Sequence, residues 1–202
     1  MMKRTRVKIC GITNREDAAA AAAAGVDALG FIFAESTRRI LPEEARTIIT
    51  SLPPFITAVG VFMDQPKTYI TETADAAGIS LIQLHGGEPP SYCCDLPLPV
   101  IKRYAITDTT ALETIRSWQS AYRNVYTLLD PGAGSGRTFD WSIPGRMTTC
   151  RLVIAGGLGP HNVADAVAAA RPYAVDVCSR VEIRPGKKDH FKIKRLMEVL
   201  KQ

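Results

Sequence analysis

The stretch VKICGITNREDAAAAAAAGVDALGFIF, residues 7–33, places a helix-favouring run between two short apolar segments. VKICGI (7–12) and ALGFIF (28–33) have the length and the apolar content of buried β-strands. Between them, an acidic first turn precedes seven alanines (18–24), and Gly25 stands where a C-terminal cap is expected. The stretch therefore predicts a strand, a helix and a second strand, with the two strands parallel and joined by a right-handed crossover.

The same alternation continues along the chain. Six further apolar segments are predicted to be strands: TAVGVF (57–62), LIQLHG (81–86), VIKRYA (100–105), VYTLLD (125–130), RLVIAGG (151–157) and AVDVCS (174–179). Helical stretches lie between most of them, with Pro42 and Pro160 expected in first turns and Gly78 expected as a cap. Eight repeats in 202 residues predict an α/β fold, a single (β/α)8 TIM barrel spanning residues 1–202. A doubly wound open sheet is the alternative, but the G-x-G-x-x-G turn of its commonest form does not follow the first strand.

Composition limits the class of protein. The chain is 46% hydrophobic and 22% charged, which is typical of a globular protein with one sizeable core. No segment approaches the roughly 18 apolar residues that span a membrane, and the first residues, MMKRTRVKICG, lack the apolar core of a signal peptide. We therefore expect a cytoplasmic protein without a membrane partner. The net charge of +5 is spread along the chain, so an anionic small molecule explains it as well as nucleic acid does, and no nucleic-acid partner is predicted.

The cysteines and histidines do not form a metal-binding pattern. Paired C-x-x-C spacing is absent from the five cysteines, which are Cys10, Cys93, Cys94, Cys150 and Cys178. The three histidines are scattered along the chain. We predict reduced thiols and no metal site.

Reactive side chains are predicted to gather at one end of the barrel, because active sites of this fold lie at the carboxyl ends of the strands. Side chains with acid, base or ionic chemistry stand at, just after or near the ends of predicted strands: Cys10, Arg38, Arg39, His85, Asp130 and Asp176. Strand alternation places Lys8 and Cys10 on the same side. From the residues alone, Cys10 is more simply explained by packing and Asp130 by a turn. His85 and Asp176 are predicted to contact a substrate, although hydrogen bonding within the loops explains them equally well.

Glycine-rich loops after the seventh and eighth predicted strands indicate a phosphate site. AGGLGP (155–160) follows one strand and CSRVE (178–182) follows the other. Barrels of this type bind phosphate at these loops, because glycine lets backbone N–H groups approach an oxyanion and a helix N-terminus adds favourable potential. We predict phosphate contacts at Gly156, Gly157 and Ser179.

Motifs along the whole chain resemble those of the phosphoribosylanthranilate isomerase family of tryptophan biosynthesis. In chain order they include VKICGIT, STRRILPEEAR, QLHGGE, GSGRTFDW, AGGL and PGKKD. The resemblance implies a barrel of the phosphosugar-binding type and an Amadori rearrangement without a metal or organic cofactor. The substrate would be the aminoaldose N-(5-phosphoribosyl)anthranilate, and the product 1-(2-carboxyphenylamino)-1-deoxyribulose 5-phosphate. Either a monomer or a homodimer is compatible with it.

The resemblance also implies roles for individual residues. Cys10 falls on the family's general base, which removes the C2′ proton, and Asp130 falls on the general acid, which protonates the furanose ring oxygen. Arg38 falls on the arginine held near the anthranilate. Where the family usually reads S-S-G-V-E, this chain has CSRVE (178–182). Its Arg180 is predicted to bind phosphate, with an orientation into solvent as the alternative.

The implied chemistry sets requirements for the two catalytic groups. Asp130 needs a pKa above the usual value of about 3.9, and Cys10 needs one below about 8.5. Lys8 is the predicted positive neighbour of Cys10, although a structural role inside the barrel is as consistent. Two other functions stay open at this point: a related phosphosugar enzyme, such as another aminoaldose isomerase or indole-glycerol-phosphate synthase, and a phosphosugar-binding barrel without turnover. The first would place carboxylates or lysines, rather than a cysteine, at the ends of the first three strands, and the intact Cys10 and Asp130 argue against the second.

Overall fold

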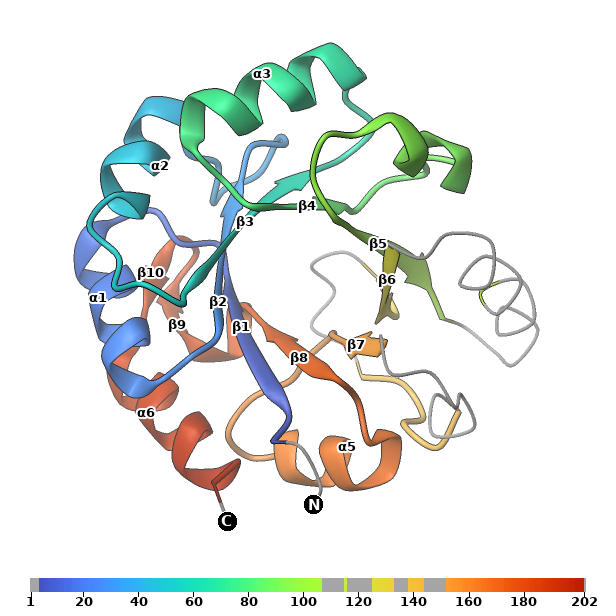
Figure 1. The fold of residues 1–202 in the computed structure, drawn as a ribbon. Helices are drawn as coiled ribbons and strands as arrows, with labels where there is room; N and C mark the ends of the chain where they lie inside the picture. The colour runs from blue at the N-terminus through green and yellow to red at the C-terminus, as the bar shows by residue number, and fades with distance from the viewer. Residues whose placement is uncertain (1–3, 107–114, 116–124, 133–137, 144–151, 202) are drawn as a thin grey trace.

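The computed structural model describes residues 4–106, 115, 125–132, 138–143 and 152–201. Within these residues, eight parallel strands close into a barrel in chain order, and β1 pairs with both β2 and β8. The strands are β1 (Arg6–Cys10), β2 (Ala28–Ile32), β3 (Thr57–Phe62), β4 (Leu81–Leu84), β5 (Val100–Ala105), β6 (Val125–Asp130), β7 (Leu152–Ile154) and β8 (Ala174–Val177). Figure 1 shows the strands at the centre and the helices around them. The predicted (β/α)8 barrel is confirmed.

The described helices form the outer layer of the barrel (Figure 1). They are α1 (Arg15–Ala24), α2 (Pro42–Ile49), α3 (Lys67–Ala77), α5 (Val163–Ala170) and α6 (His190–Val199). Short 3-10 helices, Pro90–Asp95 and Ser179–Val181, follow β4 and β8. The sequence DTTALETIRSWQS (108–120), between the fifth and sixth predicted strands, also has a helical pattern, but apart from Ile115 it lies outside the described residues. None of the helices in the described part of the chain is long and apolar enough to cross a membrane.

Helix boundaries follow the local signals with one exception. Gly25 ends α1 and Gly78 ends α3, both in the left-handed conformation, and Pro42 is the first residue of α2. The prediction for Pro160 was wrong, because α5 begins only at Val163 and Pro160 lies in the preceding turn.

Two apolar layers hold the barrel together. The larger layer lies between strands and helices and includes the fully buried Ile9, Leu29, Phe62, Ile70 and Leu196. A smaller cluster comes from β5 to β8 and from the residue directly after β7, and it consists of Ile101, Leu128, Val153, Ala155 and Ala174. Between β1 and β8, by contrast, the buried side chains of Lys8 and Asp176 form an ion pair. Charged groups thus lie inside the barrel on this side.

An antiparallel hairpin follows β8 and carries the PGKKD motif. Its strands are β9 (Glu182–Arg184) and β10 (Lys187–Lys188). The backbone N–H of Lys188 donates to Asp17 of α1 at 2.7 Å, and the Thr13 hydroxyl donates to the carbonyl of Gly186 at 2.5 Å. The hairpin therefore lies beside α1 (Figure 1), although Lys188 and Asp17 are 171 positions apart in sequence.

Candidate active site

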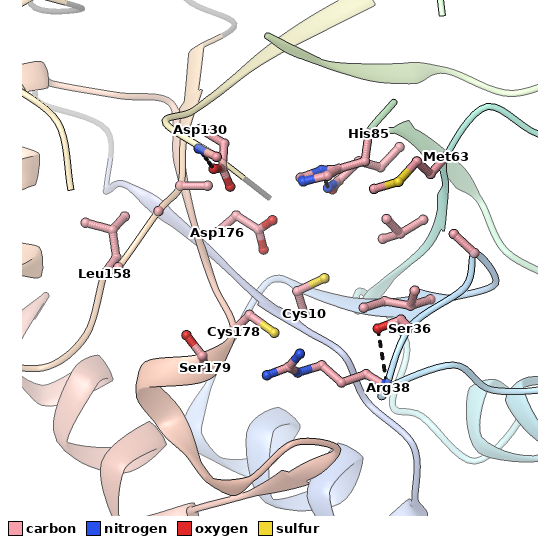
Figure 2. A pocket seen from close by; sticks show the side chains of 18 of the residues that line it. Cys10, Ser36, Arg38, Met63, His85, Asp130, Leu158, Asp176, Cys178 and Ser179 are labelled. Atoms are coloured by element: carbon pink, nitrogen blue, oxygen red, sulfur yellow. Dashed lines mark hydrogen bonds between the residues drawn. The ribbon is translucent and has the colours of Figure 1, made fainter. Parts of the chain in front are cut away.

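A cavity of about 300 Å³ lies where the carboxyl ends of the strands meet. Eight of the nine predicted site residues line it: Cys10, Arg38, His85, Asp130, Gly156, Gly157, Asp176 and Ser179. Figure 2 shows the acidic, thiol and imidazole side chains turned toward a common space. The barrel thus brings together residues that are up to 169 positions apart, counted from Cys10 to Ser179.

Cys10 is the last residue of β1, and only 7% of it is exposed. A hydrogen bond with Cys178 lowers the pKa of Cys10 to about 7, against the opposing effect of burial. The same hydrogen bond, together with burial, raises the pKa of Cys178, which therefore stays a protonated donor. The pairing of Ile9 in β1 with Val177 in β8 explains the contact, because Cys10 directly follows Ile9 and Cys178 directly follows Val177. We did not predict this neighbour, which depends on closure of the barrel.

Lys8, the predicted neighbour of Cys10, forms an ion pair with Asp176. The Lys8 Nζ lies 2.9 Å from the Asp176 Oδ1, and the two side chains are 4% and 7% exposed. Burial alone would lower the pKa of Lys8, but the effects of Asp176 and Cys10 together outweigh burial and raise it. The resulting ammonium group lowers the pKa of Cys10, as expected, but contributes less than Cys178 does.

Asp130 ends β6 with a buried carboxyl group. Burial raises the pKa of Asp130, while the N–H of Gly132, which donates to its Oδ1 at 2.8 Å, and the charge of Arg103 oppose the rise. A carboxyl group of this kind retains its proton to a higher pH than an exposed aspartate does.

Asp176 and His85 complete the polar centre of the cavity. In the view of Figure 2, the Asp176 carboxylate lies between Cys10 and Asp130, and its charge raises the pKa of both. Burial lowers the pKa of His85 to about 4, with the Arg103 charge adding to the effect. His85 is therefore a neutral imidazole at pH 7, and its Nδ1 lies 3.2 Å from the side-chain nitrogen of Gln83.

Arg38 lies on the loop after β2 and reaches the cavity over Gly11. The φ of Gly11 is +76°, and a Cβ at this position would lie 2.7 Å from the Arg38 Cδ. Glycine is therefore required at position 11 for two reasons: the backbone conformation is strained for other residues, and a side chain would collide with Arg38. Apolar side chains of Ile32, Val61 and Met63 line the same cavity.

The glycine loop after β7 has a conformation suited to anions. Gly156 and Gly157 have φ values of +91° and +61°, which allow consecutive backbone N–H groups to converge on an oxyanion. The Asn162 side chain holds the loop, accepting from the N–H of Gly159 at 2.8 Å and donating to the carbonyl of Gly157 at 3.0 Å. Ser179, the first residue of the 3-10 helix after β8, also lines the cavity.

Arg180 is the predicted site residue that stands apart. It is exposed and is not among the described residues that line the cavity. A Cβ on Gly159 would lie 2.8 Å from the Cβ of Arg180, so this arginine is next to the glycine loop. Its contact with phosphate stays a prediction. The first four residues of the GSGRTFDW motif, 134–137, lie outside the described residues.

The cavity therefore combines three kinds of surface: a cation beside apolar side chains, a centre with a low-pKa thiol and a high-pKa carboxyl group, and a glycine loop suited to an anion. Such a combination suits proton transfers on a ligand that carries anionic groups at both ends.

Comparisons with known proteins give a consistent result. The family model described as N-(5'phosphoribosyl)anthranilate (PRA) isomerase matches residues 7–199. The N-(5'-phosphoribosyl)anthranilate isomerase of Pelobacter propionicus is 47% identical over 204 residues, which cover 98% of this chain and 96% of the relative. A phosphoribosyl anthranilate isomerase solved in complex with reduced 1-(o-carboxyphenylamino)-1-deoxyribulose 5-phosphate is 41% identical, with a TM-score of 0.87 and 98% of both chains covered. Monomers generated from the dimeric isomerase of Thermotoga maritima are 40% identical, with a TM-score of 0.88 and the same coverage.

Proposed function

Because the chain belongs to the N-(5'-phosphoribosyl)anthranilate isomerase family, we propose that Cys10 and Asp130 perform the proton transfers of the family's reaction. The chain is an aldose–ketose isomerase of tryptophan biosynthesis. It converts N-(5'-phosphoribosyl)anthranilate into 1-(2-carboxyphenylamino)-1-deoxyribulose 5-phosphate. One observation carries the assignment of roles: a thiol with a lowered pKa and a carboxyl group with a raised pKa line the same cavity.

The substrate's two anionic ends suit opposite sides of the cavity. We place the anthranilate carboxylate at Arg38 and its ring against apolar side chains such as Met63. The phosphate then lies at Gly156, Gly157 and Ser179, and the ribose lies between the two ends. The product analogue bound to the relative carries the same groups, a carboxyphenylamino group and a phosphate.

In the first step, Asp130 gives its proton to the furanose ring oxygen. The bond between that oxygen and C1′ breaks, and the lone pair of the anilino nitrogen forms a C1′=N double bond. The raised pKa of Asp130 makes the proton available near neutral pH. The carboxylate that remains is stabilised by the N–H of Gly132 and by the charge of Arg103.

In the second step, the Cys10 thiolate removes the proton from C2′. The electrons of that C–H bond form a C1′=C2′ double bond, and the C1′=N electrons return to nitrogen. The enolamine then tautomerises to the ketose. A base with a pKa of about 7 suits this task, because a large fraction is ionised at neutral pH and the thiolate still binds a proton well.

Asp176 and His85 complete the proposed site as groups that bind the ribose. The Asp176 carboxylate accepts one hydrogen bond from Lys8 and retains lone pairs for a sugar hydroxyl. The neutral imidazole of His85 both donates and accepts, which suits a hydroxyl group.

We propose that the enzyme acts in the cytoplasm as a homodimer of single-domain barrels. The described cysteines, Cys10, Cys93, Cys94 and Cys178, are free thiols, which suits a reducing compartment. The Thermotoga relative is dimeric. Sedimentation velocity across a range of protein concentrations distinguishes the homodimer from the monomer.

Turnover of phosphoribosylanthranilate, followed by the fluorescence of its anthranilate group, tests the function. We expect the purified protein to consume this substrate. In the Cys10→Ser variant, kcat should fall by a factor of about 10² to 10⁴. No turnover by the unmodified protein would overturn the function. An unchanged rate in Cys10→Ser would overturn the role of Cys10 and leave the function in place.

A further inference from the structure

The carboxylate of Glu182, the first residue of β9, is buried directly behind Arg38. The Arg38 Nε donates to the two carboxylate oxygens at 2.9 and 3.1 Å, and the Arg38 Nη2 donates to Oε2 at 2.7 Å. The side chain of Glu182 is 4% exposed and that of Arg38 is 18% exposed. This ion pair joins the loop after β2 to the hairpin after β8, across 144 positions of sequence.

The ion pair occupies one edge of the guanidinium group. Glu182 takes the edge formed by Nε and Nη2, and no described residue accepts a hydrogen bond from Nη1. A guanidinium group binds carboxylates in a planar, two-point manner, so the edge that contains Nη1 is available to a second carboxylate. Arg38 lines the cavity, where that second carboxylate would come from a ligand.

We propose that Glu182 is a positioning residue, which holds Arg38 so that its available edge receives the carboxylate of the anthranilate ring. The inference rests on the proposed function, which places that ring beside Arg38. It gives the chain a basis for distinguishing an ortho-carboxylated aniline from a plain one.

Lys188 fixes Glu182 from the other side. Its Nζ donates to the Glu182 Oε1 at 2.8 Å and to the carbonyl oxygen of Cys10 at 2.5 Å, and its side chain is fully buried. The backbone N–H of Lys188 is held by Asp17 of α1. One buried carboxylate thus orients Arg38 and, through Lys188, is tied to the end of the strand that carries Cys10.

The charges of this cluster favour an anionic ligand. Burial alone would raise the pKa of Glu182, but its hydrogen bonds with Arg38 and Lys188 outweigh burial and lower it, so Glu182 is ionised. Two positive groups therefore surround one negative group. A ligand carboxylate at Arg38 would balance the remaining positive charge, and a buried charge is stabilised when it is paired and hydrogen-bonded.

The experiment compares two ligands on matched variants. The ligands are reduced 1-(o-carboxyphenylamino)-1-deoxyribulose 5-phosphate and the same molecule with hydrogen in place of the carboxyl group, and calorimetry measures their affinities. Glu182→Gln keeps the side-chain shape but turns an amide donor toward Arg38 or Lys188. Glu182→Asp keeps the charge, and Glu198→Gln removes an exposed carboxylate of α6 that pairs with Arg195 at 3.5 Å.

We expect Glu182→Gln to bind the carboxylated ligand roughly tenfold more weakly, the change produced by losing about 1.4 kcal/mol of charge-assisted hydrogen bonding. The ligand without the carboxyl group should keep its affinity. Glu182→Asp should lie between Glu182→Gln and the unmodified protein, and Glu198→Gln should match the unmodified protein for both ligands. In turnover, the KM of Glu182→Gln should rise more than its kcat falls.

Equal losses for both ligands in Glu182→Gln would overturn the proposal, because they would indicate a general effect on the site. Unchanged affinities would overturn it as well. If Glu182→Gln does not fold, the two ligands are compared on Glu182→Asp with the same criteria. A failure of the proposed function is distinguishable, because it would leave the unmodified protein without turnover, whereas the positioning role fails in variants of an active enzyme.

Discussion

Cys178 and Cys10 hydrogen-bond to each other where the last strand of the barrel meets the first. The Cys178 thiol has a raised pKa and stays protonated, whereas the pKa of Cys10 is lowered to about 7. A hydrogen bond donated to the charged form of a group stabilises that form. The contact therefore favours the thiolate of Cys10, the form that a general base requires.

Alkylation of Cys10 by iodoacetamide should depend on pH with a midpoint of about 7. The thiolate is the reactive form, so the rate rises with pH through the pKa and becomes constant above it. Peptide mapping by mass spectrometry measures the rate at Cys10 separately from that at Cys93, whose pKa burial raises to about 11. A midpoint at or above the ordinary thiol value of about 8.5 would contradict the structure.

Removing the Cys178 thiol should raise that midpoint. Cys178→Ala deletes the largest favourable contribution to the pKa of Cys10 and leaves the opposing effect of burial. A hydrogen bond to a charged group contributes about 1.5 to 3 kcal/mol, so we expect a rise of about one to two pH units. Cys178→Ser keeps a donor and should shift the midpoint less. Identical midpoints in the Cys178→Ala variant and the unmodified protein would mean that the charges of Lys8 and Lys188 support the thiolate without Cys178.

The strands of the barrel could be predicted from the sequence, but not where each one stops. The three strands at 57–62, 100–105 and 125–130 were predicted with the bounds that the structure gives them. The predicted segments 81–86 and 174–179 extend two residues too far, because β4 ends at Leu84 and β8 at Val177. The additional residues, such as His85 and Cys178, leave the strand ladder and line the cavity. An apolar pattern reports burial and does not mark where backbone pairing ends.

Site residues could be predicted from the sequence when they lie at the end of a predicted strand. Cys10 and Asp130 end their strands, and the rule for barrels places both at the cavity. Cys178, Glu182 and Lys188 depend instead on which elements meet after the barrel closes. Each of them has a partner more than 140 positions away in sequence, as Glu182 has in Arg38 and Lys188 has in Cys10. No spacing along the chain indicates such contacts.

Asp130→Asn should abolish most turnover while binding is retained. The amide has the shape of the carboxyl group but cannot give a proton to the ring oxygen, and general acid catalysis contributes about 10² to 10⁴ to the rate. The substitution acts on the reaction step, so kcat should fall while the affinity for the reduced product analogue stays close to that of the unmodified protein. Asp165→Asn, on the exposed surface of α5, is the control and should keep full activity. Near-normal kcat in Asp130→Asn would assign the acid to another group.

Gly11→Ala should weaken both stability and substrate binding. A side chain at φ +76° is strained, which costs about 1 to 2 kcal/mol, and the new Cβ would displace the Arg38 side chain that lies 2.7 Å from it. Gly25→Ala provides a matched control, because Gly25 has φ +90° with nothing within 4 Å of the new Cβ. Both variants should have a lower free energy of unfolding in urea, but KM should rise only in Gly11→Ala. A similar KM in the two variants would show that Arg38 accommodates the methyl group.

The buried ion pair of Lys8 and Asp176 should contribute to the stability of the fold. Asp176→Asn leaves the Lys8 ammonium group buried without its partner, which should lower the free energy of unfolding by about 3 to 5 kcal/mol at pH 7. Urea denaturation measures this loss. Adding Lys8→Met to the variant removes the unpaired charge and should recover part of the stability.

The pH dependence of this loss identifies its origin. In the unmodified protein the pKa of Lys8 is raised above 10.5, so its contribution to stability is fully present below that pH and is lost above it. In Asp176→Asn, the raising effect of Asp176 is lost, so burial, the largest single effect, is opposed only by Cys10 and lowers the pKa of Lys8 in the folded state. The folded variant then binds fewer protons than the unfolded chain below pH 10.5, so its stability rises with pH in this range. The difference in free energy of unfolding between the two proteins should therefore shrink from pH 7 toward pH 10.5. A difference that does not change with pH would show that the loss comes from packing and not from the unpaired charge of Lys8.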